Sequence, residues 1–124
     1  MERSVRQTRL LPGYEDRYTE LHARVPEWLA RELRAAGILR WEIWRDGTSL
    51  IHIIDCADSY AATMRALVTV PRDPAWHDVI DECLDHEADQ VGALSPVWYL
   101  DETGQGPGKQ VFAYERENKG ETNG

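Results

Sequence analysis

The feature that most constrains the fold is a β-hairpin pattern in the first half of the chain. Apolar and polar side chains alternate over residues 38–46, which is the period of a β-strand. Asp46-Gly47 follows, a residue pair that favours a tight two-residue turn. Residues 50–55 are then almost wholly apolar, so we expect this second strand to be central in a sheet that helices cover on one side.

A helical pattern precedes the hairpin, from Tyr14 to Ala36. Its apolar residues recur every three or four positions, which places them on one helix face. Pro26 lies inside this run, and proline removes a backbone donor and clashes with the preceding turn. We therefore expect a kink, or a short break with Pro26 starting a second helix, and Gly37 as the stop signal.

The remaining elements complete an alternating order of strands and helices. We expect a first strand at residues 4–11, helices from Asp58 or Ser59 to about Leu67 and from about Ala75 to His86, and a last strand at Val97–Leu100. This order predicts an α+β fold of the ferredoxin-like, split βαβ type with a four-stranded antiparallel sheet. Helices would cover one face only, leaving Trp44 or Trp41 on the other. Pairing two such faces would give a homodimer, a dimeric α+β barrel.

The C-terminal part differs in composition from the rest. We expect one domain over residues 1–101 and a flexible tail over residues 102–124, where glycine and polar residues dominate. An added edge strand at residues 110–114 is the one ordered alternative within the tail.

Composition excludes several classes of protein. The net charge of −8 lacks the basic surface that nucleic-acid binding needs, and it disfavours anionic membranes. No stretch approaches the roughly 20 apolar residues of a membrane span, and the N-terminus lacks the apolar core of a signal peptide. We expect a cytoplasmic protein in which Cys56 and Cys83 are reduced, partly buried thiols.

Tyr18 and His22 are the first candidates for chemistry. They stand four residues apart on the expected helix, so both side chains project from one face. An imidazole with an ordinary pKa of about 6.5 can give or take a proton near neutral pH. The alternative is a surface pair without a chemical role, because such pairs are common on helices.

Two tryptophans and several histidine and acidic residues are further candidates for a functional site. Trp41 and Trp76 offer flat apolar faces on which a sugar ring can stack, although core packing is the alternative. His77 with Asp81 and Glu82 with His86 are one-turn pairs, but the two pairs point in different directions and supply no third ligand, so we predict no metal site. His52 lies in an apolar strand and is expected to be a packed or sheet-face histidine.

These residues together resemble the L-rhamnose mutarotase family. The resemblance rests on residues 13–22 followed by residues 26–29, on residues 33–44, on Pro74-Ala75-Trp76-His77 and on Val97–Leu100, all in the same order. It implies a dimeric ferredoxin-like isomerase that interconverts the α and β anomers of L-rhamnose or a related deoxy-sugar without a cofactor.

The resemblance also implies roles for individual residues. His22 matches the proton donor of the family, and Tyr18 matches a tyrosine that contacts the sugar. Trp41 stands where a substrate-contacting tyrosine is usual. Trp76 begins what is a tryptophan pair in the family, and here His77 is its second member and could contact substrate.

Two alternatives remain open from the sequence. One is a cofactor-free isomerase or cyclase of a specialised pathway on the same scaffold, because a fold alone does not fix a function. The other is a non-catalytic protein that binds a small molecule between Tyr18 and His22.

Overall fold

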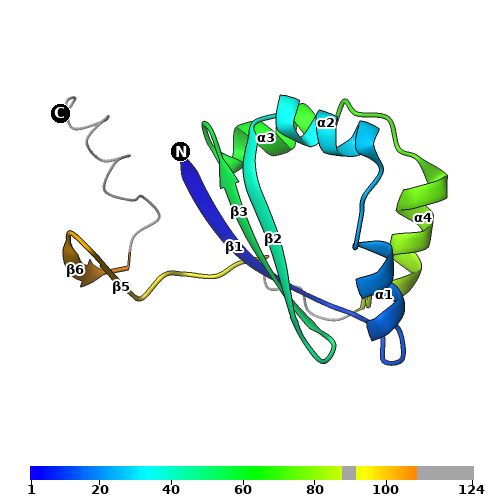
Figure 1. Cartoon of the computed structure of the whole chain (residues 1–124), viewed down its shortest axis with the longest axis horizontal. Helices are drawn as coiled ribbons and strands as arrows, with labels where there is room; N and C mark the ends of the chain where they lie inside the picture. The colour runs from blue at the N-terminus through cyan, green and yellow to red at the C-terminus, as the bar shows by residue number, and fades with distance from the viewer. Residues whose placement is uncertain (88–91, 109–124) are drawn as a thin grey trace.

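The computed structural model describes residues 1–87 and 92–108 of the 124-residue chain. Figure 1 shows the arrangement of its elements. The strands are β1 (Glu2–Arg9), β2 (Ile38–Asp46), β3 (Ser49–Cys56), β4 (Gly92–Ala93), β5 (Trp98–Asp101) and β6 (Gly104–Pro107). The helices are α1 (Glu15–Leu21), α2 (Glu27–Ala35), α3 (Tyr60–Leu67) and α4 (Pro74–Cys83).

The main sheet confirms the predicted ferredoxin-like architecture. Its strand order is β2-β3-β1-β4, and the neighbouring strands are antiparallel. The predicted hairpin is formed by β2 and β3, where Asp46 pairs with Ser49 across a turn in which Gly47 has a φ of 61°. The apolar strand β3 is central, as its composition indicated, and lies between β2 and β1.

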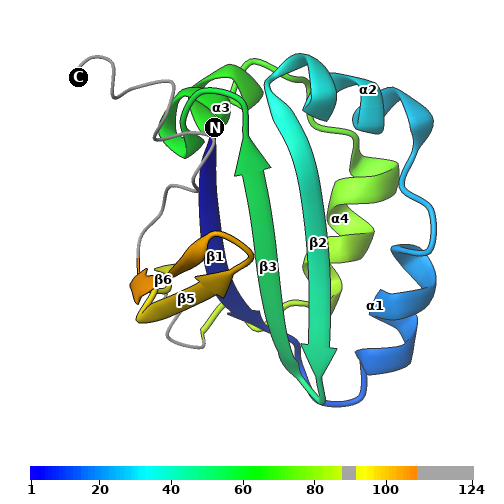
Figure 2. The same ribbon diagram turned by 60° about the vertical axis from the view of Figure 1, so that its left-hand side comes forward.

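All four helices lie on one face of the sheet (Figures 1 and 2). Helices α2 and α3 contact the strands, whereas α1 and α4 pack mainly against each other. The predicted break at Pro26 separates α1 from α2: Pro26 caps α2 with an extended ψ of 137°, and its carbonyl accepts hydrogen bonds from Leu29 and Ala30. Because of this break, α1 and α2 run in different directions over the face of the sheet.

The hydrophobic core consists of two separate clusters. One contains the buried residues Leu10, Tyr18, Leu50 and Cys83, and the other contains Ile38, Ile54 and Cys56. The first cluster joins α1 and α4 to the turn end of the sheet, and the second lies at the opposite end of β2 and β3. Both cysteines are buried and form no disulfide, and the Cys83 thiol donates to the Val79 carbonyl at 3.7 Å.

The predicted closing strand of the sheet was wrong. Residues 97–100 were expected to pair within the main sheet, but among the described strands Trp98–Asp101 pairs with Gly104–Pro107 in a separate hairpin. The fourth strand of the sheet is instead the two-residue β4, which pairs with Arg6 and Gln7 of β1. The sequence contains no signal for β4, because a two-residue strand is defined by its backbone pairing alone. Two residues are too few to show the alternation of apolar and polar side chains that is typical of a strand.

Smaller differences concern the ends of elements. The first strand covers residues 2–9 rather than 4–11, and α4 ends at Cys83 rather than at His86. Residues 102–108, expected to begin a flexible tail, form the turn and second strand of the β5–β6 hairpin. The edge strand suggested at residues 110–114 lies outside the described residues, and the division at residue 101 stays a prediction.

The face of the sheet opposite the helices is open. Strand alternation places Leu50 and Ile54 toward the helices, so Ile51 and Ile53 of β3 point to the open face. Val5 pairs with Ile53, and Trp44, which is 63% exposed, pairs with Ile51. The β5–β6 hairpin extends away on this same side (Figures 1 and 2), without extensive contact with other described elements.

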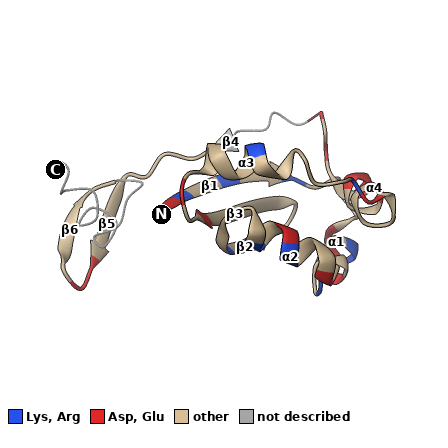
Figure 3. Cartoon of the chain, turned by 90° about the horizontal axis from the view of Figure 1, so that it is seen from above, with Lys and Arg blue, Asp and Glu red and all other residues tan. Residues whose placement is uncertain are grey.

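Within the described part of the chain, no helix combines the length and the apolar character that crossing a membrane requires. Figure 3 shows that charged residues of both signs are spread over the helices, while the β5–β6 hairpin carries acidic residues only at its turn.

Candidate active site

A cavity of about 720 Å³ lies between the helices and the sheet. Its lining comes from α1, the α1–α2 loop, α2, β2, β3, α3 and α4, so five helical or loop segments and two strands enclose it. All five site residues predicted from the sequence line this cavity: Tyr18, His22, Trp41, Trp76 and His77. The cavity therefore brings together residues that lie almost 60 positions apart in the sequence.

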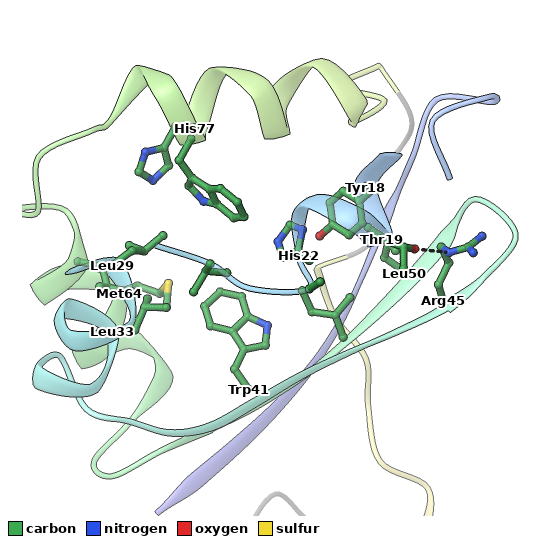
Figure 4. Close-up of a pocket in the computed structure, with 15 residues that line it drawn as sticks. Tyr18, Thr19, His22, Leu29, Leu33, Trp41, Arg45, Leu50, Met64 and His77 are labelled. Carbon is green, nitrogen blue, oxygen red and sulfur yellow. Dashed lines mark hydrogen bonds between the residues drawn. The ribbon is translucent and has the colours of Figure 1, made fainter. Parts of the chain in front are cut away.

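Tyr18, His22 and Trp76 form an aromatic group at one end of the cavity. Tyr18 lies on α1, and His22 is the C-cap residue of the same helix. Their ring centroids are 4.2 Å apart, and the His22 ring meets Trp76 of α4 edge-on at 5.2 Å. The contact of α1 with α4 thus fixes His22 between a phenol and an indole. Figure 4 shows the Tyr18 hydroxyl directed to the cavity beside His22.

Burial shifts the pKa values of this pair in opposite directions. It raises the pKa of Tyr18 to about 12, with a smaller contribution from the nearby Cys83 thiol. It lowers the pKa of His22 below the ordinary 6.5, although the Tyr18 carbonyl partly opposes the change. His22 Nδ1 is buried and makes no hydrogen bond of good geometry with any described residue. Nε2 is therefore the ring nitrogen left to meet a substrate.

Trp41 and His77 lie on opposite walls of the cavity (Figure 4). Trp41 is on the helix-facing side of β2, and its indole nitrogen donates to His52 Nδ1 at 3.3 Å. His77 folds back on the start of its own helix, where the Asp73 backbone N–H donates to its Nδ1 at 2.9 Å. The sequence predicted that Trp41 or Trp44 would lie on the open face, and only Trp44 does so.

The rest of the lining was not predicted as part of the site. Arg45 and Thr19 lie at the polar end, where the Arg45 guanidinium donates to the Thr19 hydroxyl at 3.2 Å. The opposite end is apolar (Figure 4), with Leu29, Leu33 and Met64 among its residues. The strand period could have identified Arg45, since it lies two positions beyond Ile43 and four beyond Trp41 on one face. The apolar end depends on tertiary packing and has no local signal.

The described residues contain no group of three or more histidine, cysteine, aspartate or glutamate side chains placed to hold a metal ion. The donors in the cavity are a phenol, two imidazoles, a hydroxyl and a guanidinium. Side chains of this kind can transfer protons and form hydrogen bonds with a neutral, hydroxylated molecule.

The fold and the site define a class of protein: a small ferredoxin-like α+β protein with a helix-covered cavity and a buried imidazole–phenol pair. Within that class, the sequence model of the L-rhamnose mutarotase family matches residues 3–100. The chain belongs to this family, whose members are isomerases that act on a carbohydrate. The match includes all five site residues.

Solved structures agree with this fold. The L-rhamnose mutarotase of Formosa agariphila superimposes with a TM-score of 0.57 at 18% identity, covering 82% of this chain and all of that one. Tetracenomycin F2 cyclase of Streptomyces glaucescens, a type-II polyketide cyclase, gives a TM-score of 0.54 at 15% identity and covers 91% and 98% of the two chains. No curated protein sequence matches this chain significantly.

Proposed function

We propose that this protein is a sugar mutarotase that interconverts the α and β anomers of L-rhamnose or a related deoxy-sugar. One observation carries the proposal: the His22 imidazole and the Tyr18 phenol stand 4.2 Å apart on the wall of a cavity that Trp76 and Trp41 flank. Two indoles give flat surfaces for the apolar face of a pyranose, and the pair supplies proton transfer beside them.

The reaction needs only proton movements. His22 donates a proton from Nε2 to the ring oxygen while the bond between C1 and that oxygen breaks. The anomeric hydroxyl loses its proton to water, giving the open aldehyde. Rotation about the C1–C2 bond and the reverse proton transfers close the ring as the other anomer. Tyr18 holds a sugar hydroxyl, because its raised pKa keeps the phenol protonated as a donor.

The rate acceleration expected from these two residues is sufficient for this reaction. Positioned acid–base catalysis contributes about 10²–10⁴-fold, and mutarotation already proceeds slowly in water. No electrons or groups are transferred between molecules, so the mechanism asks for no cofactor.

The test is anomer exchange of L-rhamnose followed by saturation-transfer NMR. We expect His22→Ala to lose at least nine-tenths of the acceleration, because the proton donor is removed. His86→Ala is the matched control: His86 is exposed and outside the cavity, and among the described residues its ring bonds the Asp81 carbonyl, so the rate should not change. Near-wild-type exchange by His22→Ala would contradict the assignment.

A second candidate is a cofactor-free isomerase or cyclase that acts on a larger, more apolar molecule. The observation that favours it is the apolar end of the cavity around Leu29, Leu33 and Met64, which lies apart from the proton-transfer pair. A panel of deoxy-sugars separates the candidates. Accelerated exchange supports the mutarotase, binding without exchange supports a binding protein, and no response to any sugar supports the second enzyme.

We also propose that the protein is a cytoplasmic homodimer. Support for the dimer comes from the open sheet face, where Trp44 and Ile51 form an apolar cross-strand pair. Further support comes from three exposed apolar residues in or next to the β5–β6 hairpin. They are Val97 (84% exposed), Trp98 (59%) and Leu100 (65%). Apolar side chains gathered in this way mark surfaces that meet a partner.

A further inference from the structure

A chain of hydrogen bonds crosses the helix-facing side of the sheet behind the cavity. Thr8 of β1, His52 of β3 and Trp41 of β2 are its members. The Thr8 hydroxyl lies 2.9 Å from His52 Nε2, and the Trp41 indole nitrogen lies 3.3 Å from His52 Nδ1. His52 does not line the cavity, whereas Trp41 does. His52 therefore contacts Trp41, a residue of the cavity wall, without itself lining the cavity.

The donors and acceptors of this chain fix the state of the histidine. An indole nitrogen can only donate, so His52 Nδ1 must offer its lone pair to Trp41. The proton of the neutral ring is then on Nε2, which donates to the Thr8 hydroxyl. A protonated ring would present a hydrogen at Nδ1 and could not accept from Trp41.

The surroundings of His52 keep the ring neutral. Burial lowers its pKa to about 4, and the nearby His22 acts in the same direction. Arg6 stands opposite His52 on β1, but its guanidinium lies over the Tyr60 ring at 3.9 Å and donates to Ser4. At neutral pH the acceptor for the Trp41 N–H is therefore present.

We propose that His52 is a positioning residue that holds the Trp41 indole in place, so that the part of the cavity wall formed by Trp41 presents an apolar surface without a free N–H. The proposal rests on the proposed function, because it concerns the binding of sugar in that cavity. Trp41 is 37% exposed, and its ring would be free to change rotamer without this bond.

The occupied N–H has a consequence for the substrate. Ile43, the next residue of β2 on this face, is also apolar, and the charged Arg45 lies two positions further along the strand at the polar end of the cavity. A substrate hydroxyl in contact with this wall would lose its hydrogen bonds to water without gaining one from the protein. The wall therefore favours the least hydroxylated face of a sugar. The shape of the wall depends on the Trp41 indole, which His52 holds in place.

Three variants test the role. His52→Leu removes both hydrogen bonds, and we expect KM for L-rhamnose to rise about threefold to tenfold, the range for one lost hydrogen bond. The kcat should stay within about twofold, since His22 and Tyr18 are untouched. His52→Gln keeps an acceptor and a donor and should restore KM to within about twofold. In the Trp41→Phe background, His52→Leu should have no further effect.

A measurement on the unmodified protein tests the same idea without catalysis. In ¹⁵N NMR, the His52 ring should show the Nε2–H tautomer, and the Trp41 indole signal, identified by its loss in Trp41→Phe, should shift in His52→Leu. The opposite tautomer, an unmoved indole signal, or an equal KM change in the Trp41→Phe background would overturn the proposal. An inactive wild-type protein with the expected NMR signals would refute the proposed function and leave the positioning of Trp41 intact.

Discussion

Burial governs the chemistry of individual residues in this site. The shielded imidazolium of His22 is a stronger acid than an exposed one, because the same desolvation that disfavours its charge eases the loss of its proton. The neighbouring phenol of Tyr18 keeps its proton at every physiological pH. The His22 imidazole therefore exchanges protons, and the Tyr18 phenol donates hydrogen bonds.

The pH dependence of catalysis follows from this shift. A donor must be protonated in the free enzyme, so kcat/KM should be greatest below the pKa of His22 and fall as the pH rises through it. The midpoint should lie below 6.5, because burial lowers this pKa. Initial exchange rates at limiting L-rhamnose between pH 4.5 and 8 measure it. A rate that instead falls on acidification would make His22 a base rather than a donor.

His52 makes a separate contribution, to stability. Its folded-state pKa of about 4 lies below the ordinary 6.5, so the unfolded chain takes up a proton first as the pH falls. The stability that this group contributes is complete above pH 6.5 and is lost as the pH falls toward 4. We expect a loss of about 2 kcal/mol, below the full value because water still reaches part of the ring.

Urea unfolding of wild type and of His52→Gln at pH 7 and pH 4.5 isolates this contribution. Carboxylates titrate in both proteins, so only the difference between them reports on His52. An equal loss of stability in the two proteins on acidification would show that the histidine is not held neutral.

At the scale of elements, the turn between α2 and β2 is the most tightly constrained. Gly37 has a φ of 114°, which disfavours every residue with a Cβ, and an added Cβ would stand 3.0 Å from the Thr63 hydroxyl of α3. The Ala57 N–H donates to the Gly37 carbonyl, which ties this turn to the end of β3. The glycine thus allows α3 to pack close to the start of β2.

We expect Gly37→Ala to lower the free energy of unfolding by about 2 kcal/mol, from backbone strain together with the close contact. Gly47→Ala is the matched control, because Gly47 also has a positive φ of 61° but nothing lies within 4 Å of its added Cβ. Its cost should be about 1 kcal/mol. Equal losses in the two variants, measured by urea denaturation, would show that the contact with Thr63 contributes nothing.

Elements with strong local signals were predictable, and elements without them were not. Asp46-Gly47 and the flanking periods defined the β2–β3 hairpin, and Pro26 defined the break between α1 and α2. By contrast, Trp98–Asp101 has the apolar composition of a sheet strand but forms a separate hairpin, and Gly92–Ala93 forms a sheet strand without such composition. Pairing partners, rather than strand propensity, decide these cases.

For the whole molecule, part of the site could be predicted and part could not. Helix spacing predicted that Tyr18 and His22 share one face, and the family resemblance predicted that Trp76 belongs to the same site; the three rings are in contact. The bond between Trp41 and His52 depends on the pairing of β2 with β3, and the apolar end of the cavity depends on how α2 and α3 pack. Such features follow from three-dimensional register, which one sequence specifies only weakly.

The proposed dimer gives the prediction at this scale. Trp44→Asp places a charge on the open sheet face and should shift the protein toward monomer at micromolar concentration, as measured by light scattering after size exclusion. Val68→Asp is the control, because Val68 is 83% exposed but lies at the C-cap of α3 on the helix side. A wild-type monomer, or a Trp44→Asp variant as dimeric as wild type, would contradict the proposed interface.

The separation of the core into two clusters has a thermodynamic consequence. The cavity lies between them, and its lining includes Leu50 of one cluster and Leu33, which packs against the other. A ligand bound there contacts residues of both clusters, and by mass action it adds about 2.7 kcal/mol of stability at a hundredfold excess over its Kd. The melting temperature should then report occupancy, so calorimetry with candidate sugars can identify the natural substrate even where turnover is too fast to follow.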